Sequence, residues 1–163
     1  MQEVLDRARL LLARGEVPEA RSVLEALLVE HPGDPRVLLL LSSALLSARE
    51  GEEALALARR AVEADPSSAE AYNEVARTLH ALGRNEEAVE AAHAARRLLP
   101  LARNAPQTAP VFLTLVWCLR DLRRYKEALS LAEEGLALVP DSILAGWASD
   151  VEEELAHAER ERC

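Results

Sequence analysis

The chain has 163 residues, of which 50% are hydrophobic and only 3% aromatic, and its formal net charge is −9. This length suits one domain, and the dominance of alanine and leucine, both strong helix formers, predicts an all-α fold. The negative charge disfavours nucleic acid and anionic membrane surfaces as partners. The longest apolar run, Val37–Leu41, is far shorter than a membrane span, so membrane insertion is not expected.

Two cysteines, Cys118 and Cys163, have neither the number nor the spacing of a disulfide framework or a metal site. We expect Cys118 to be a buried or half-buried apolar side chain, and Cys163 to be a thiol at a frayed terminus. The first residues mix acids and arginines with leucines and lack the apolar core of a signal peptide. A cytoplasmic location is therefore expected, and the arginine-rich, lysine-poor, alanine-rich composition suggests a bacterial source.

Four prolines mark an internal repeat along the chain. Pro32, Pro66 and Pro100 follow one another at intervals of 34 residues, and Pro140 comes 40 residues after the third. An alanine stands twelve residues before each proline, at Ala20, Ala54, Ala88 and Ala128. A large apolar residue stands twenty-eight residues before each proline, at Val4, Leu38, Tyr72 and Phe112. Unrelated helices would rarely share this register.

Each unit is predicted to form two amphipathic helices, for example over residues 35–48 and 52–64 of the second unit. Leu38, Leu41 and Leu45 follow the i, i+3, i+7 spacing of one buried helix face. We expect the tight turn between the two helices to need a glycine, which is supplied by Gly15, Gly51 and Gly83. Each proline ends a second helix, because the residue before a proline is disfavoured in the α region.

The 34-residue period and the order of residue types resemble the tetratricopeptide repeat. The third unit is the clearest copy, with Tyr72, Ala76, Leu79, Gly83, Ala88, Ala92, Ala95 and Pro100. The resemblance implies an all-α, right-handed superhelical solenoid of antiparallel helix pairs with about nine helices. We expect one domain over residues 1–163. Its repeats would cover about 1–34, 35–68, 69–108 and 109–142, with a capping helix over 142–162.

The fourth unit departs from the pattern. Arg123 stands at the glycine position and Gly135 where alanine is usual. Six extra residues near 101–108, with Pro106 and Pro110 around them, are expected to form a loop or to extend the preceding helix. Such a lengthened connection is usually a tolerated surface feature; the alternative is that it re-angles the fourth unit or contacts a partner. In the capping helix we expect one apolar stripe, made of Ile143, Trp147, Val151, Leu155 and Ala158, to pack on the fourth unit.

The resemblance further implies that the first helix of each unit lines a concave groove. The partner-binding residues predicted in this way are Leu5, Arg9, Leu12, Leu39, Leu40, Leu46, Asn73, Arg77, His80, Leu113, Trp117 and Arg120. Acids and arginines balance along the groove, so the sign of the ligand's charge is not assigned. Family members that capture chaperone C-termini use a clamp of lysine and asparagine. This function is disfavoured here, because the single lysine, Lys126, lies on a second helix.

Leucines at groove positions make residues 37–48 hydrophobic nearly all round, which is typical of a helix buried on both sides. We expect Leu5, Leu12, Leu39 and Leu46 to form a strip that something must cover. Leaving these side chains in water would forgo roughly 1.5–3 kcal/mol each. A bound peptide, a second copy of the chain or a returning segment of the same chain could provide the cover.

These observations favour a non-catalytic adaptor or scaffold that holds a peptide or helix of a partner protein in its groove, with a helix as the preferred ligand. One alternative is a dedicated chaperone for a secreted or membrane-inserted client. Another is a homodimer formed through the leucine strip. No cofactor, metal site or enzymatic activity is expected, because the four histidines fall at unrelated repeat positions and no catalytic motif occurs.

Overall fold

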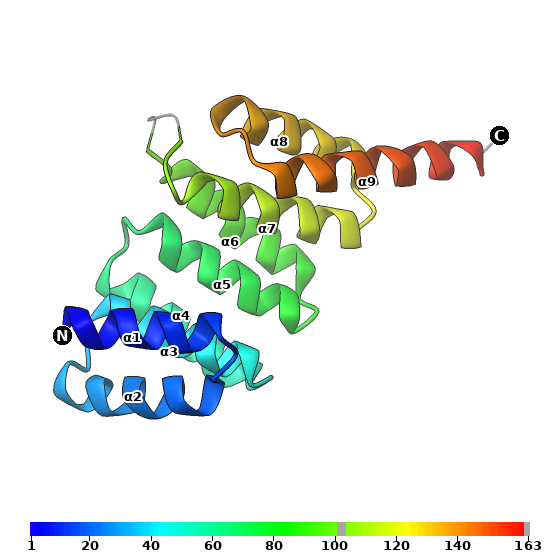
Figure 1. The fold of residues 1–163 in the computed structure, drawn as a ribbon. Helices are drawn as coiled ribbons and strands as arrows, with labels where there is room; N and C mark the ends of the chain where they lie inside the picture. The colour runs from blue at the N-terminus through cyan, green and yellow to red at the C-terminus, as the bar shows by residue number, and fades with distance from the viewer. Residues whose placement is uncertain (101–103, 162–163) are drawn as a thin grey trace.

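The computed structural model describes residues 1–100 and 104–161, and all its regular structure there is helical. The helix pairs stack in chain order, from α1 and α2 in the lower part of Figure 1 to α8 and the final helix α9 at the top. Their bounds are α1 Gln2–Ala13, α2 Val17–Glu30, α3 Pro35–Ser47, α4 Gly51–Ala64, α5 Ala69–Ala81, α6 Asn85–Arg97, α7 Thr108–Asp121, α8 Tyr125–Leu138 and α9 Ser142–Arg160. The all-α solenoid predicted from the sequence is confirmed.

The helix ends follow from local sequence signals. α4 ends two residues before Pro66, and α8 ends two residues before Pro140. α3 begins with Asp34 as its N-cap, whose carboxylate accepts a hydrogen bond from the Arg36 backbone N–H at 2.9 Å. Ser68 and Asp141 cap α5 and α9 in the same way. These caps satisfy backbone donors that have no partner inside the helix.

Small side chains allow the two helices of each pair to approach closely. The alanines that recur before the prolines, together with Ala8 and Ala76, are completely buried. The buried residues form two clusters: one joins α1 to the first part of α5, and the other extends from α4 to α9. Phe112 lies at the centre of the second cluster and is 0% exposed. Aliphatic packing therefore supplies almost the whole core, as the scarcity of aromatics indicated.

The turns inside the four pairs share a left-handed residue. Gly15 and Gly83 have φ angles of 77° and 73°, and Arg49 and Arg123 have φ angles of 66° and 56° at the equivalent places. The expectation that Gly51 serves as the turn glycine of the second unit is therefore wrong. Gly51 is the first residue of α4, and a Cβ there would lie 2.7 Å from Leu82 Cδ2. It is needed for close packing, and the left-handed turn is made by an arginine.

Gly135 replaces the usual alanine for a steric reason. A Cβ at this position would lie 2.7 Å from Phe112 Cγ and 2.8 Å from Leu144 Cδ2. Because Phe112 and Leu144 both pack against the α8 backbone here, glycine leaves the space they occupy.

The connection between α6 and α7 is a loop wherever the structure describes it; residues 101–103 of the predicted insert lie outside the described residues. α6 ends at Arg97, so the insert does not extend that helix. The Asn104 backbone N–H donates to the Leu138 carbonyl at 3.2 Å, which ties the loop to the end of α8. Ala105 and Thr108 are buried, whereas Pro106 and Gln107 between them are exposed.

The capping helix α9 packs on the fourth unit through the predicted stripe except at its first position; Leu155 and Ala158 are half-buried. Leu144 and Val151 are completely buried, and Trp147 is half-buried against the same cluster. Ile143 is 59% exposed, so its assignment to the stripe is wrong. Leu144, the next residue, is completely buried in its place.

Cys118 is a buried core residue, as predicted. Burial raises the pKa of its thiol to about 12, so the sulfur stays protonated and unreactive at neutral pH. Cys163 lies outside the described residues.

Candidate functional site

The predicted strip of uncovered leucines is largely absent. Leu5 is 0% exposed and Leu39 is 8% exposed, while Leu12 and Leu46 are half-buried. The expectation that these four side chains need an external cover is therefore wrong. Successive first helices contact one another directly (α1 with α3, α3 with α5), and the leucines fill the seams between them.

The units differ in residue type at the fifth repeat position. Leu5, Leu39 and Leu113 stand at the fifth position of the first, second and fourth units, and Asn73 stands there in the third. Asn73 is only 7% exposed, and its side-chain Oδ1 has no hydrogen-bond partner among the described residues. A buried acceptor without a partner costs roughly 1–3 kcal/mol.

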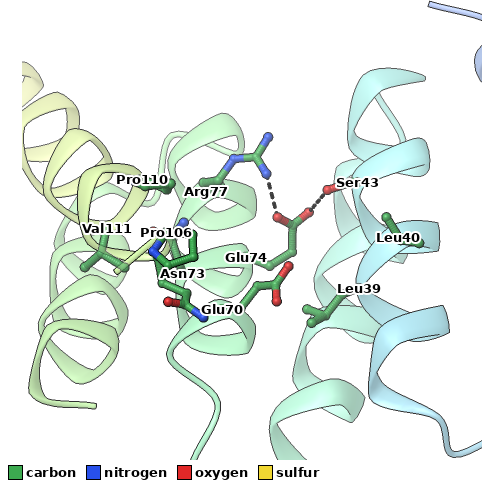
Figure 2. Close-up of a pocket in the computed structure, with 11 residues that line it drawn as sticks. Leu39, Leu40, Ser43, Glu70, Asn73, Glu74, Arg77, Pro106, Pro110 and Val111 are labelled. Atoms are coloured by element: carbon green, nitrogen blue, oxygen red, sulfur yellow. Dashed lines mark hydrogen bonds and ion pairs between the residues drawn. The ribbon is translucent and has the colours of Figure 1, made fainter. Parts of the chain in front are cut away.

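Asn73 lines a cavity of about 360 Å³ between α3, α5 and α7 (Figure 2). Its volume lies within the range of roughly 300–1,000 Å³ that is common for ligand sites. One wall comes from α3, the floor from α5, and the other wall from the loop before α7 and the first turn of α7. The lining residues are Leu39, Leu40, Ser43, Glu70, Asn73, Glu74, Arg77, Pro106, Gln107, Pro110 and Val111. The insert thus contributes directly to the concave surface.

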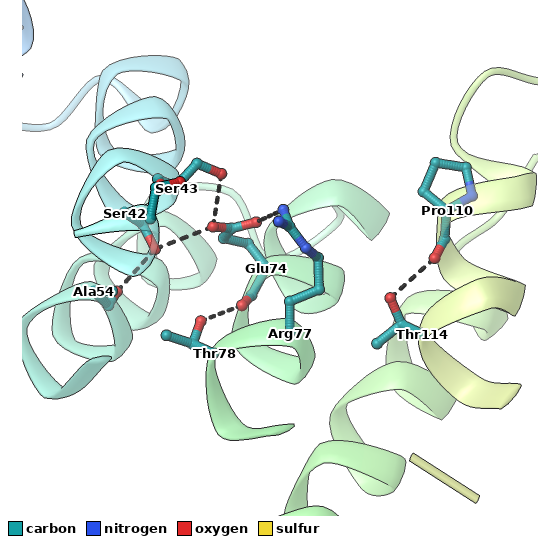
Figure 3. Close-up of polar contacts among 9 residues, drawn as sticks. Ser42, Ser43, Ala54, Glu74, Arg77, Thr78, Pro110 and Thr114 are labelled. Atoms are coloured by element: carbon teal, nitrogen blue, oxygen red, sulfur yellow. Dashed lines mark hydrogen bonds and ion pairs between the residues drawn. The ribbon is translucent and has the colours of Figure 1, made fainter. Parts of the chain in front are cut away.

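A hydrogen-bond network holds the cavity floor rigid (Figure 3). Glu74, 5% exposed, accepts hydrogen bonds from the Ser43 hydroxyl at 2.8 Å and from Arg77 Nη1 at 2.7 Å. The Ser42 hydroxyl donates to the Ala54 carbonyl at 2.9 Å and also approaches Glu74 at 3.4 Å. The Glu74 carboxylate therefore links α5, on which it lies, to the α3 wall of the cavity. Its charge is offset by Arg77.

Glu70 has a different environment, although it lies one turn before Glu74 on the same helix. Its side chain is exposed at the cavity, and no hydrogen bond or ion pair to it occurs among the described residues. Glu70 and Asn73 are three residues apart on α5, a spacing that places side chains next to each other on a helix. Figure 2 shows both on the side of α5 that faces the cavity.

The C-terminal part of the groove contains two tryptophans, and its polar side chains form hydrogen bonds with one another. His80 Nε2 lies 2.8 Å from Asp121 Oδ2, and Arg120 Nε donates to Glu154 at 2.8 Å. The Trp117 and Trp147 rings meet edge to face at 5.7 Å, and the Arg120 guanidinium lies 4.9 Å from the centre of the Trp147 ring. These contacts connect α5, α7 and α9 and leave the Trp117 indole N–H without a partner in the described part of the chain.

The structure therefore gathers only some of the predicted site residues around one cavity. Leu39, Leu40, Asn73 and Arg77 line it. His80, Trp117 and Arg120 form the aromatic cluster, Leu113 is half-buried against the core, and Arg9 pairs with Asp6 at 3.0 Å far from both. Leu5 belongs to the core and cannot contact a ligand, and Leu12 and Leu46 pack against the core.

Sequence reasoning did not select several residues of the cavity. Glu70 and Pro110 occupy the second repeat position, one of the groove positions implied by the resemblance, so the repeat register could have found them. Pro106 and Gln107 reach the cavity through the path of the insert, and no periodic signal places them there.

Within residues 1–100 and 104–161 no group of three or more histidine, cysteine or acidic side chains is arranged to hold a metal ion. None of the described helices is long and apolar enough to cross a membrane.

Comparison with solved structures shows the same fold in other proteins. A thermophilic TPR protein of Thermus thermophilus, TTC0263, is 22% identical with a TM-score of 0.82, and the match covers 94% of this chain and 82% of that one. PilF of Pseudomonas aeruginosa is 21% identical with a TM-score of 0.80 over 98% of this chain and 69% of that one. The Sgt2 TPR domain of Aspergillus fumigatus is 17% identical with a TM-score of 0.66 over 77% and 81%.

A search of curated proteins found no match. Two models of the tetratricopeptide repeat match the chain, one over residues 5–69 and the other over residues 67–141. Together they extend across all four helix pairs. The chain therefore belongs to the tetratricopeptide repeat family, whose members generally bind other proteins and are not catalysts.

Proposed function

We propose that this protein is a non-catalytic adaptor that binds a peptide segment of a partner protein in the cavity between α3, α5 and α7. The observation that carries the proposal is the cavity of about 360 Å³, lined by Asn73 at a repeat position that the other units fill with leucine. The Asn73 amide makes no hydrogen bond within the described part of the chain, and an amide can bond to the backbone of a segment that enters the cavity.

An extended segment fits this site better than a helix. The backbone N–H groups of a helix are bonded internally beyond its first turn, whereas an extended peptide presents a free donor at every residue except proline. The walls made by Leu39, Leu40 and Val111 offer apolar surface to an adjacent side chain. This arrangement replaces the helix that the sequence alone favoured as ligand.

Self-association through the leucine strip loses its basis. Leu5 and Leu39 are covered by their own chain, so they offer little surface to a second copy.

The experiment is a selection of random heptapeptides displayed on phage against the folded protein. We expect enriched peptides that bind the wild type and lose at least tenfold in affinity against Gln107→Trp. Gln107 is exposed at the cavity wall, so an indole there fills the cavity without disturbing the core. The matched control is Glu63→Trp, on the exposed side of α4. Peptides that bind both variants equally, or no enriched peptide at all, would contradict the proposal.

A further inference from the structure

The polar groups that a ligand can reach beside Asn73 on the floor of the cavity are hydrogen-bond donors. Asn73 is more than nine-tenths buried and its Oδ1 is enclosed, so the reachable part of its amide is the Nδ2 donor. The Arg77 side chain is 41% exposed and carries N–H groups beyond the one that bonds to Glu74. Asn73 and Arg77 are four residues apart on α5, a spacing that places both on one face of the helix.

The acceptors next to these donors are already bonded or solvated. Glu74 accepts from the Ser43 hydroxyl through Oε1 and from Arg77 through Oε2, and it is buried. Glu70 is exposed, so water bonds to it whether or not a ligand is present. A peptide N–H pressed against the floor between Asn73 and Arg77 would therefore lose its water without gaining an acceptor.

This arrangement distinguishes between the residues of an extended peptide. In a β-strand, the N–H and the C=O of one residue point to the same side of the chain. A residue whose carbonyl accepts from Asn73 or Arg77 therefore aims its own N–H at the floor as well. Proline is the exception, because it presents a carbonyl and has no N–H. Its fixed φ also restricts the free peptide, which lowers the entropy lost on binding.

The walls of the cavity suit the proline ring. Leu39 and Leu40 lie on the α3 side, and Pro106, Pro110 and Val111 lie on the α7 side (Figure 2). These side chains offer carbon surface on both sides of the floor, so a ring that stands between them is removed from water.

We propose that the cavity selects a proline of the extended segment, with the ring between the apolar walls and the carbonyl accepting hydrogen bonds from Asn73 and Arg77. This inference rests on the proposed function and names the chemistry of its ligand. Ser43 bonds to Glu74, and Glu74 bonds to Arg77. The guanidinium is therefore oriented before the segment arrives.

The test uses the heptapeptides selected above, with proline replaced by alanine and, separately, by N-methylalanine. Both replacements remove the ring, but only alanine restores the N–H. We expect a proline at one fixed position of the enriched sequences. Alanine at this position should weaken binding to the wild type by about tenfold or more, and N-methylalanine by less than about threefold, because an N–H without an acceptor is the larger penalty. Fluorescence polarisation of labelled peptides measures these affinities.

Variants of the protein test the donor at Asn73. Asn73→Asp keeps the shape of the side chain and replaces the donor by an acceptor. It should weaken the proline peptide about tenfold and reduce the difference between the proline and alanine peptides, because the N–H of alanine then gains an acceptor. Asn73→Leu should also weaken the proline peptide, while its thermal midpoint is kept or raised. The control Glu63→Gln, exposed on α4, should leave all affinities unchanged.

The outcomes distinguish this inference from the proposed function. Peptides that are lost in Gln107→Trp but have no fixed proline would overturn the inference and leave the peptide site standing. The same holds if alanine binds as well as proline, or if N-methylalanine binds as weakly as alanine. If no peptide is enriched, both fail.

Discussion

Two regions of the concave surface differ in how their first helices pack against one another. Between α1 and α3 the seam is filled by leucines such as Leu5, which is completely buried. Between α5 and α7 the equivalent position is Asn73, and the surface beside it opens into a cavity. The third repeat therefore has a polar side chain, Asn73, at a position where the other repeats have a leucine. In this protein, the repeat position that departs from leucine is also the position where the packing of the first helices opens into a cavity.

The largest expected effect comes from placing an asparagine among the buried leucines between α1 and α3. Leu5→Asn should lower the free energy of unfolding by about 3–5 kcal/mol, since it removes a fully buried side chain and strands an amide. Chemical denaturation followed by circular dichroism measures this. The exposed Leu10→Asn is the control and should change stability by less than about 0.5 kcal/mol. Comparable losses for the two variants would mean that the seam is not packed as described.

The reverse exchange should have a smaller effect with the opposite sign. Asn73→Leu restores the leucine of the other units and removes an unsatisfied acceptor, so we expect a gain of about 1–2 kcal/mol in unfolding free energy. The same denaturation experiment measures it. A clear loss of stability would show that the Asn73 amide supports the fold, and the contrast between the two seams would then lose its meaning.

The smallest expected effect concerns the start of α3, a helix that packs against α1 and also forms one wall of the cavity. Hydrogen bonding from Arg36 lowers the pKa of Asp34 below its ordinary value. A carboxyl whose pKa is lower in the folded state adds stability above its unfolded pKa, near 3.9, and loses it as the pH falls through the folded value. Asp34→Asn should therefore be less stable than the wild type at pH 7, by less than about 1 kcal/mol because Arg36 is solvent-exposed.

This difference should shrink as the pH is lowered below 4. Thermal midpoints of the two proteins, measured at pH 7 and then stepwise down to pH 2.5, provide the check. A constant difference across that range would assign the effect to something other than the Asp34 charge.

The sequence by itself determined the repeat, the helix pairs and the small residues between them. Alanine recurs where the two helices of a pair approach closely, and proline recurs where the second helix ends. Both requirements involve only neighbouring parts of the chain, so the sequence reveals them. Even the unreactive Cys118 could be predicted, since an isolated apolar-flanked cysteine on a helix usually packs in the core.

Which groove positions are buried and which line the cavity could be learned only from the tertiary structure. Periodicity gives the side of a helix but not the distance to the next helix, so the burial of Leu5 and Leu39 could not be read from it. The rotation of α9 that exposes Ile143, and the path that brings Pro106 and Gln107 to the cavity, likewise depend on non-repeating contacts. These features depend on side-chain packing between neighbouring units, which determines how close the helices lie and how each is rotated.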